Sequence, residues 1–241
     1  MPSERVDFSR RVAPVELPEW LDDPCSYEQL CSYLGDLQQV NTVSFGARPT
    51  LHWLRGLTDK HRGRALRIVD VGCGGGDMLR RIERWAKRRG LAVQLTGIDL
   101  NPDVIQAARA MTPANSRIEW ISGDAYSYAE PADGVISALL THHLEEEEIV
   151  RFLTWMESTA LCGWYINDLC REAVPYRLFR LIAATARWHK AVRHDGPVSF
   201  RRSFREEDWQ RMLAAAGVAA EAVESRRWSP GRLCVGRTKS V

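Results

Sequence analysis

The sequence has 241 residues, of which 45% are hydrophobic and 27% are charged, and its formal net charge is +2. A chain of this length builds a full core as one domain without disulfide or metal staples. Its near-neutral charge gives no broad field for nucleic acid or membranes. It has no apolar run near the roughly 20 residues of a membrane span, and its N-terminus lacks a signal-peptide core. We expect a soluble, cytoplasmic protein without stable membrane insertion.

The elements are predicted in chain order from the spacing of the apolar residues. Residues 1–24 form an arm rich in proline and charge, and helical spacing follows at about 26–40 and 47–58. From residue 66, short apolar runs alternate with helical stretches, which is typical of a doubly wound, mostly parallel sheet with helices on both faces. The predicted strands are 66–71, 93–98, 117–122, 134–139 and 163–167, and the predicted helices between them are 77–89, 102–111 and 145–158.

The last third of the sequence departs from this alternation. Residues 173–190 and 204–216 are predicted to be helical, and 191–203 are predicted to form a loop between them. Two final apolar runs, at about 218–227 and 232–236, are predicted to pair as a closing hairpin. The six cysteines show no Cys-x-x-Cys spacing, so we expect reduced and mostly buried thiols.

A glycine loop carries the strongest signal for chemistry. It reads Asp70-Val71-Gly72-Cys73-Gly74-Gly75-Gly76, between a strand-like and a helix-like run. Gly72 and Gly74 let the backbone turn tightly and approach a ligand, and Gly76 lets the next helix begin close to the strand. The first N–H groups of that helix are free to bind an anionic or polar ligand. A dinucleotide-binding loop would need its third glycine at position 77, which is Asp.

Acidic residues follow the next two predicted strands. Asp99 ends the second strand, where a carboxylate accepts hydrogen bonds from ribose hydroxyls in dinucleotide folds. The alternative role for Asp99 is a helix cap, which Asn101 fills better. Asp124 lies just past the third strand, where it receives an adenine amino group or serves as an ordinary turn aspartate.

The order Asp-x-Gly-x-Gly-x-Gly, Ile-Asp-Leu-Asn and Gly-Asp-Ala within residues 66–170 resembles class I S-adenosylmethionine (SAM)-dependent methyltransferases. The resemblance implies an α/β, Rossmann-like, seven-stranded and mostly parallel sheet, with an N-terminal helical region and a helical cap inserted after strand five. It implies SAM as the cofactor, with Asp70 at the methionine amino group, Asp99 at the ribose and Asp124 at the adenine. The implied cofactor-binding residues are Asp70, Gly72, Cys73, Gly74, Gly76, Asp99, Leu100, Asp124, Ala125, Leu139 and Leu140.

The residues after the fourth strand bear on the acceptor. The stretch 137–143 reads Ser-Ala-Leu-Leu-Thr-His-His, where enzymes of this fold that methylate amino groups in bases or protein glutamine carry Asn/Asp-Pro-Pro-Tyr/Phe. A metal-assisted catechol type needs an acid there, and none precedes Glu145, so no metal is expected. The runs 166–171 and 193–199 resemble a bacterial small-molecule subgroup tied to secondary metabolism, whose acceptors are aromatic, phenolic or polyketide-derived.

Three histidines are candidates for a catalytic base, because an oxygen acceptor benefits from a base whose pKa is near neutrality. The order of preference is His143, then His194, then His142. The alternative for the adjacent pair is structural, with one ring packed and one capping a helix. His194 beside Asp195 is either an oriented base or part of a turn. No third metal ligand follows the pair at a known spacing.

Residues 171–205 are predicted to cover the acceptor as a cap. One interpretation is an amphipathic helix with solvated arginines, a second is a lid whose arginines meet an acidic substrate or carrier, and a third is a membrane-surface helix. The cap carries the apolar residues Tyr176, Phe179, Leu181, Ile182 and Trp188 and the basic residues Arg171, Arg177, Arg180 and Arg187.

The predicted function is methyl transfer from SAM to a hydroxyl of a small aromatic, phenolic or polyketide-like acceptor, free or carrier-bound. The alternatives are a C-methyltransferase acting on a quinone-type ring and a non-catalytic cofactor-binding module. An RNA methyltransferase is disfavoured by the near-neutral charge, and no nucleic-acid partner is expected. A homodimer is compatible with the sequence. The chain is divided into an arm with helices (1–60), a cofactor-binding core (61–170), a cap (171–205) and a C-terminal helix with closing strands (206–241).

Overall fold

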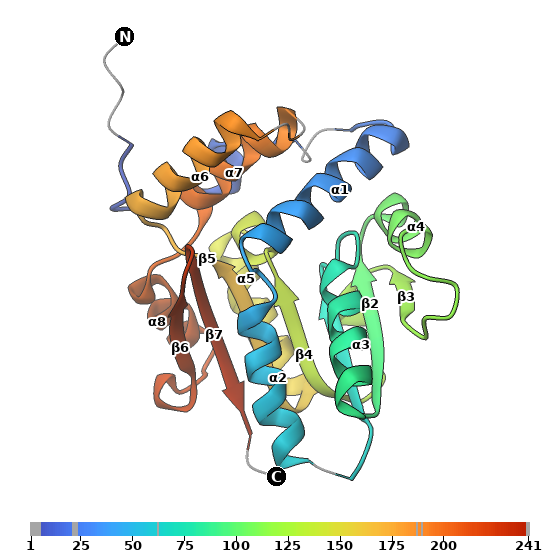
Figure 1. The fold of residues 1–241 in the computed structure, drawn as a ribbon. Coiled ribbons are helices and arrows are strands. Elements are labelled where there is room, and N and C mark those ends of the chain that lie inside the picture. Colours follow the sequence, from blue (N-terminus) through green and yellow to red (C-terminus); the bar gives the residue numbers. More distant parts are fainter. Residues whose placement is uncertain (1–5, 21–23, 62, 187, 189, 240–241) are drawn as a thin grey trace.

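A computed structural model describes residues 6–20, 24–61, 63–186, 188 and 190–239. Its centre is a seven-stranded sheet in the order β3-β2-β1-β4-β5-β7-β6 (Figure 1). Strands β1 to β5 run parallel, whereas β7 runs antiparallel to both β5 and β6. The strands are β1 (Leu66–Val71), β2 (Val93–Asp99), β3 (Glu119–Ser122), β4 (Ala132–Ala138), β5 (Ala160–Leu169), β6 (Glu224–Trp228) and β7 (Arg232–Thr238).

Helices cover both faces of this sheet. One face is packed by α2 and α3 through a cluster that includes Leu57 and Ile82, and the other by α5 and α8 through Phe152 and Trp209. The α-helices are α1 (Tyr27–Val43), α2 (Arg48–Lys60), α3 (Asp77–Arg89), α4 (Pro102–Ala110), α5 (Glu146–Thr159), α6 (Ala173–Thr185), α7 (Lys190–Arg202) and α8 (Glu206–Ala215). Short 3-10 helices are η1 (Pro14–Glu16), η3 (Ala125–Ser127), η4 (Thr141–His143) and η5 (Ala220–Ala222).

The predicted fold class is confirmed, and so is the closing hairpin. Strands β1, β4 and β5 read as near-continuous apolar runs because helices bury both of their faces. The hairpin pairs Glu224 with Gly236 and Trp228 with Arg232. The six cysteines are free thiols, and four of them are buried, as expected. None of the described helices is long and apolar enough to span a membrane.

The predicted loop over 191–203 is wrong, because α7 is helical over most of that range. Gly196 and Pro197 favour a loop in the sequence, since glycine weakens a helix and proline lacks an N–H donor. Packing overrides this preference: Val192 and Phe200 are buried, and a Cβ on Gly196 would lie only 2.0 Å from the ring of Phe179. The glycine therefore allows α6 and α7 to pack closely.

Buried arginines hold the N-terminal arm against the cap. Arg202 of α7 donates to the carbonyls of Leu17 (2.8 Å) and Pro14 (3.1 Å). Arg171 was predicted to belong to the cap helix, but it precedes α6, is buried, and pairs with Asp208 at 2.6 Å. Its role is therefore structural, and Arg187 lies outside the described residues. The arm, α1 and the cap together close over the carboxyl ends of the parallel strands.

Candidate active site

The glycine loop joins β1 to α3 at the centre of the sheet. Gly72, Gly74 and Gly76 have φ values of +66°, +52° and +75°, a region that favours glycine. A Cβ on Gly76 would lie 2.1 Å from Trp120, and one on Gly72 would lie 2.8 Å from Leu140, whereas Gly74 faces open space. Two glycines therefore permit close packing, and Gly74 leaves room for a ligand at the loop.

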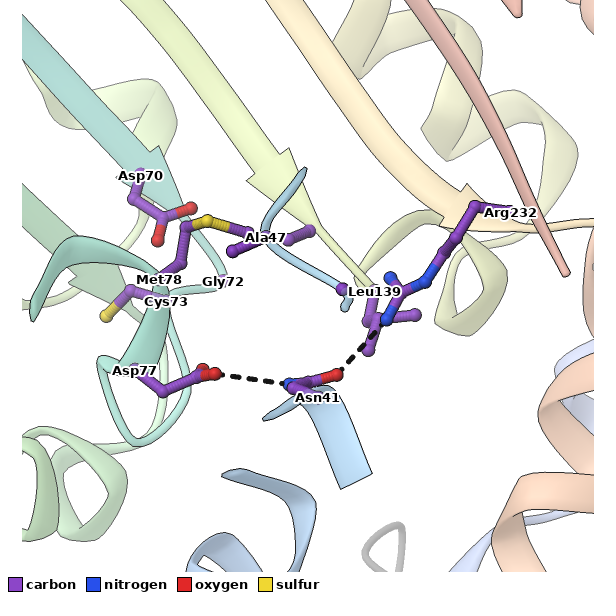
Figure 2. Close-up of a pocket in the computed structure, with 11 residues that line it drawn as sticks. Asn41, Ala47, Asp70, Gly72, Cys73, Asp77, Met78, Leu139 and Arg232 are labelled. Atoms are coloured by element: carbon purple, nitrogen blue, oxygen red, sulfur yellow. Dashed lines mark hydrogen bonds between the residues drawn. The ribbon is translucent and has the colours of Figure 1, made fainter. Parts of the chain in front are cut away.

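The loop borders a small pocket, which we call the loop pocket (Figure 2). Asp70 lies on one wall, is buried, and has no hydrogen-bond partner for its Oδ1 among the described residues. Burial, followed by the nearby charges of Asp77 and Asp99, raises the pKa of Asp70 well above its usual value. The lining residues are Asn41, Gly46, Ala47, Asp70, Gly72, Cys73, Asp77, Met78, Ala138, Leu139 and Arg232.

A buried guanidinium faces these acids across the loop pocket. Arg232 of β7 donates to the amide oxygens of Asn41 (3.1 Å) and Asn167 (3.2 Å). Asn41 in turn donates to Asp77 at 3.4 Å, so it links the acidic wall to the basic wall, as Figure 2 shows. A pocket with carboxylates on one side and a guanidinium on the other complements the ammonium and carboxylate groups of an amino acid. The residues present therefore fit the methionine part of SAM.

Asp99 and Asp124 lie at the carboxyl ends of the next two strands, beside the loop. Asp99 accepts hydrogen bonds from the N–H groups of Gly74 and Asn101, both at 3.1 Å, and burial raises its pKa. Asn101 caps α4, as the sequence indicated. Asp124 caps η3 by accepting from the N–H of Tyr126 at 3.0 Å, so the turn role considered for it is present. Crevices outside the carboxyl ends of parallel strands are the usual ligand sites of such sheets.

The apolar residues implied for the cofactor surround this crevice. Leu100 is 74% exposed next to Asp99, and Ala125 is buried behind Asp124. Leu140 packs against Gly72, whereas Leu139 has a φ of +58°, which is uncommon for a residue other than glycine. Leu139 lines the loop pocket and also the larger cavity next to it.

The larger cavity, which we call the acceptor cavity, measures about 210 Å³ and shares Asn41, Leu139 and Arg232 with the loop pocket. Its walls are mostly apolar and come from α1, α6 and α7. Of the predicted cap residues, Phe179, Ile182 and Trp188 line it, whereas Tyr176 packs against Phe8 instead. Aliphatic and aromatic lining residues include Tyr33, Leu37, Val40, Val43, Leu178, Phe179, Ile182, Trp188, Val192 and Phe200.

One wall of the acceptor cavity is polar. Glu19 lies between two imidazoles, with its Oε1 3.9 Å from Nε2 of His142 and its Oε2 3.7 Å from Nε2 of His143. Glu19 also accepts a hydrogen bond from Ser199 at 2.7 Å and lies 3.6 Å from a guanidinium nitrogen of Arg202. Glu19 could not be selected from the sequence, because the arm carries it to the histidines from a distant part of the chain.

Glu19, His142 and His143 each offer one atom that can bind a metal ion, and these three atoms lie within 4.8 Å of one another. The guanidinium of Arg202 already supplies positive charge to Glu19, so a cation would meet electrostatic repulsion there.

His142 and His143 differ in burial. His142 is buried, and its Nδ1 lies 2.7 Å from Asp168. Asp168 also accepts a hydrogen bond from the hydroxyl of Thr141. Burial lowers the pKa of His142, but the carboxylates of Asp168 and Glu19 outweigh it and raise the pKa above its usual value. The side chain of His143 is 31% exposed and lines the cavity.

The structure does not bring His194 to this wall. Its side chain is 62% exposed, and its Nδ1 lies 2.9 Å from its neighbour Asp195. Asp195 is buried and accepts from the hydroxyl of Tyr33 (3.0 Å) and the N–H of Trp20 (2.8 Å). Only Asp195 of this pair lines the acceptor cavity. Asp195 thus ties α7 to α1 and the arm.

Comparisons with known proteins agree with this geometry. Residues 68–159 match the family model described as a methyltransferase domain. The fold is similar to that of the plantazolicin methyltransferase BpumL, crystallised with a pentazolic desmethylPZN analogue and S-adenosylhomocysteine (SAH) (TM-score 0.65, 17% identity, 92% of this chain and 93% of that chain covered).

Two further structures show the same similarity. They are magnesium protoporphyrin IX methyltransferase from Synechocystis PCC 6803 with bound SAH (TM-score 0.55, 14% identity, 91% and 90% covered) and human N-acetylserotonin methyltransferase with SAM (TM-score 0.61, 16% identity, 90% and 57% covered). At these identities the likeness concerns the fold. The domain match over residues 68–159 and this fold together indicate a SAM-dependent methyltransferase.

Proposed function

We propose that this methyltransferase acts on a hydroxyl group of a small aromatic, phenolic or polyketide-like acceptor, in secondary metabolism. The observation that carries the proposal is the acceptor cavity, which is apolar, adjoins the loop pocket, and has one titratable wall at Glu19 and the two histidines. The neighbouring structures are named as methyltransferases of plantazolicin, magnesium protoporphyrin IX and N-acetylserotonin. The division of the chain into four segments remains part of this proposal.

SAM would supply a sulfonium-bound methyl group, which transfers to a nucleophile with SAH as the leaving group. In this proposal Asp70 holds the ammonium group of the methionine part, and Arg232 with Asn41 holds its carboxylate. Asp99 accepts hydrogen bonds from the ribose hydroxyls, and Asp124 receives the adenine amino group. The support for Asp70 is its orphaned buried oxygen, which calls for a cationic partner. Cys73, the loop glycines, Leu100, Ala125, Leu139 and Leu140 provide the remaining contacts.

The raised pKa of Asp70 predicts that SAM affinity depends on pH. The free carboxyl keeps its proton to a higher pH than an ordinary aspartate, whereas the SAM ammonium requires the ionised form. SAM affinity should therefore rise as the pH rises through the raised pKa of free Asp70, with a proton released on binding. Calorimetry in two buffers of different ionisation enthalpy measures both quantities. An Asp70→Asn variant that binds as tightly, or that retains the same pH dependence, would refute the role of Asp70.

Leu139 and Arg232 stand where the two spaces meet, so an acceptor in the cavity and a donor in the loop pocket face each other there. Methyl transfer needs the acceptor atom, the methyl carbon and the sulfur in line. Such positioning contributes about 7–11 kcal/mol to lowering a barrier. The apolar walls also exclude water, which would otherwise solvate the acceptor oxygen.

His143 is the proposed base. A ring nitrogen of His143 would take the proton of the acceptor hydroxyl as that oxygen receives the methyl group from SAM, with SAH as the leaving group. His142 is less suited to this task, because its raised pKa favours the protonated ring, which has no lone pair to offer. Glu19 orients His143, and Asp168 orients His142.

Filling the acceptor cavity should raise KM for the acceptor without weakening SAM binding. Replacing Ile182 with tryptophan places a larger side chain at a position that lines the cavity, so KM for a phenolic acceptor should rise about tenfold or more. Leu181→Trp is the matched control, because Leu181 lies next to it, is 67% exposed and does not line the cavity. SAH release and SAM calorimetry measure the two properties. Equal effects of both substitutions would contradict the assignment of the cavity to the acceptor.

A carbon acceptor on a quinone-type ring is the alternative. Such a reaction needs no strong base, because the ring carbon is itself the nucleophile. Replacing both His143 and His194 with alanine would then leave turnover largely intact. Loss of turnover with unchanged SAM affinity supports the oxygen acceptor instead.

A further inference from the structure

Exposed apolar side chains border the acceptor cavity on two sides. On one side, Val43 ends α1 and is 61% exposed, and Phe45 in the turn that follows is 59% exposed. On the other side, Leu178 and Ile182 of α6 are exposed as well. Val43, Leu178 and Ile182 all line the cavity, so these segments from distant parts of the chain flank one opening. Large exposed apolar side chains gathered at one place mark an interaction surface.

Helix α6 continues this apolar border onto the outer surface. Because each residue of an α-helix turns by about 100°, Val174, Leu178 and Leu181 share one face, and all three are exposed. Ile182 lies on the side of that face nearer the cavity, and Arg177 lies on its other side. An apolar path therefore runs without interruption from the outer face of α6 to the cavity wall.

Arginines without acidic partners stand beside both apolar segments. Phe45 shares a groove with Arg48, Arg84 and Arg88, which come from the start of α2 and from one face of α3. Within the described part of the chain, Arg48, Arg84, Arg88 and Arg177 form no ion pair. The whole chain has a net charge of only +2, so this is a local concentration of positive charge. We call the apolar border with these four arginines the mouth face.

We propose that the mouth face docks on an anionic lipid surface, so that an apolar acceptor passes from the lipid into the cavity. Helices that lie at a membrane surface combine an apolar face with flanking arginine or lysine, as α6 does. Each basic residue near an anionic bilayer contributes about 1 kcal/mol, or roughly fivefold in affinity. A second copy of the chain fits less well, because a symmetric contact would bring the unpaired arginines of the two mouth faces together. Only the use of the docked cavity rests on the proposed function.

The test is co-sedimentation of the full chain with vesicles of phosphatidylcholine, with or without roughly 40% phosphatidylglycerol. We expect binding to the anionic vesicles only, and release at about 0.5 M salt. Leu181→Glu and the pair Arg84→Glu with Arg88→Glu should each lower the partition coefficient at least about tenfold. Arg151→Glu is the matched control, because Arg151 is an exposed arginine of α5, on the opposite face of the sheet. It should bind as the native chain does.

Several outcomes would overturn the proposal. They are absence of sedimentation, equal binding to neutral vesicles, and equal loss in the Arg151→Glu control. A native dimer that Leu181→Glu converts to a monomer in analytical ultracentrifugation, with no vesicle binding, would assign the face to a second copy. SAM calorimetry on each variant shows that the fold and donor site persist. Since vesicle binding is measured without acceptor, its failure leaves the proposed methylation reaction to be judged by its own assays.

Discussion

Replacing His143 with glutamine should lower kcat for a phenolic acceptor by about 10²–10⁴-fold, which is the usual contribution of a general base. Glutamine retains a polar side chain of similar reach but cannot take up a proton at neutral pH. SAM affinity should stay unchanged, because His143 lines the acceptor cavity and not the loop pocket. Single-turnover measurement of SAH formation separates the chemical step from product release.

His194→Gln is the control for this substitution. His194 is the same residue type, lies on α7, and is largely exposed outside the cavity lining. We expect it to retain native kcat. If His194→Gln lost as much activity as His143→Gln, or if His143→Gln remained fully active on a phenol, the base assignment would be wrong.

Replacing Asp99 with alanine should weaken SAM binding by about 100-fold or more. Two hydrogen bonds from ribose hydroxyls to a carboxylate contribute about 3 kcal/mol together. Asp99 also accepts from the N–H of Gly74, so its loss additionally loosens the loop. Calorimetry with SAM gives the change in affinity, and thermal unfolding without SAM gives the change in stability.

Asp103→Ala provides the matched control for Asp99. Asp103 is an exposed aspartate in the first turn of α4, four residues further along the chain. It should bind SAM as the native chain does. Native-like affinity in Asp99→Ala would mean that the ribose is held elsewhere, and an equal loss in both variants would indicate a general effect of charge.

The sheet was predictable because its signals are local. A buried parallel strand is a short apolar run, and β1 was predicted with the bounds that the structure shows. The error at α7 has the opposite origin. Gly196 and Pro197 oppose a helix locally, and only the contact with Phe179 from another helix shows why a glycine stands there. Tertiary packing of this kind leaves no periodic pattern in the sequence.

The candidate site was likewise predictable only in part. The glycine loop, Asp99 and Asp124 follow successive strands, so they can be recognised as a motif in the order of the sequence. Glu19 and Arg232 come from the two ends of the chain, and nothing in their neighbours marks them. The exposed position of His194 was likewise unpredictable, because the sequence gives no orientation for a side chain on α7. Asp77 was visible as the residue that replaces a third loop glycine, but its link to Asn41 and Arg232 was not.

The most direct test of the proposed reaction is to incubate the protein with methyl-labelled SAM and a panel of phenolic acceptors, and to locate the label in the product by mass spectrometry and NMR. We expect a labelled methyl ether, formed by the native chain and strongly reduced in His143→Gln. Label on a ring carbon would contradict the oxygen acceptor and the role of His143. A native chain that binds no SAM and yields no labelled product would contradict the donor site at the glycine loop as well.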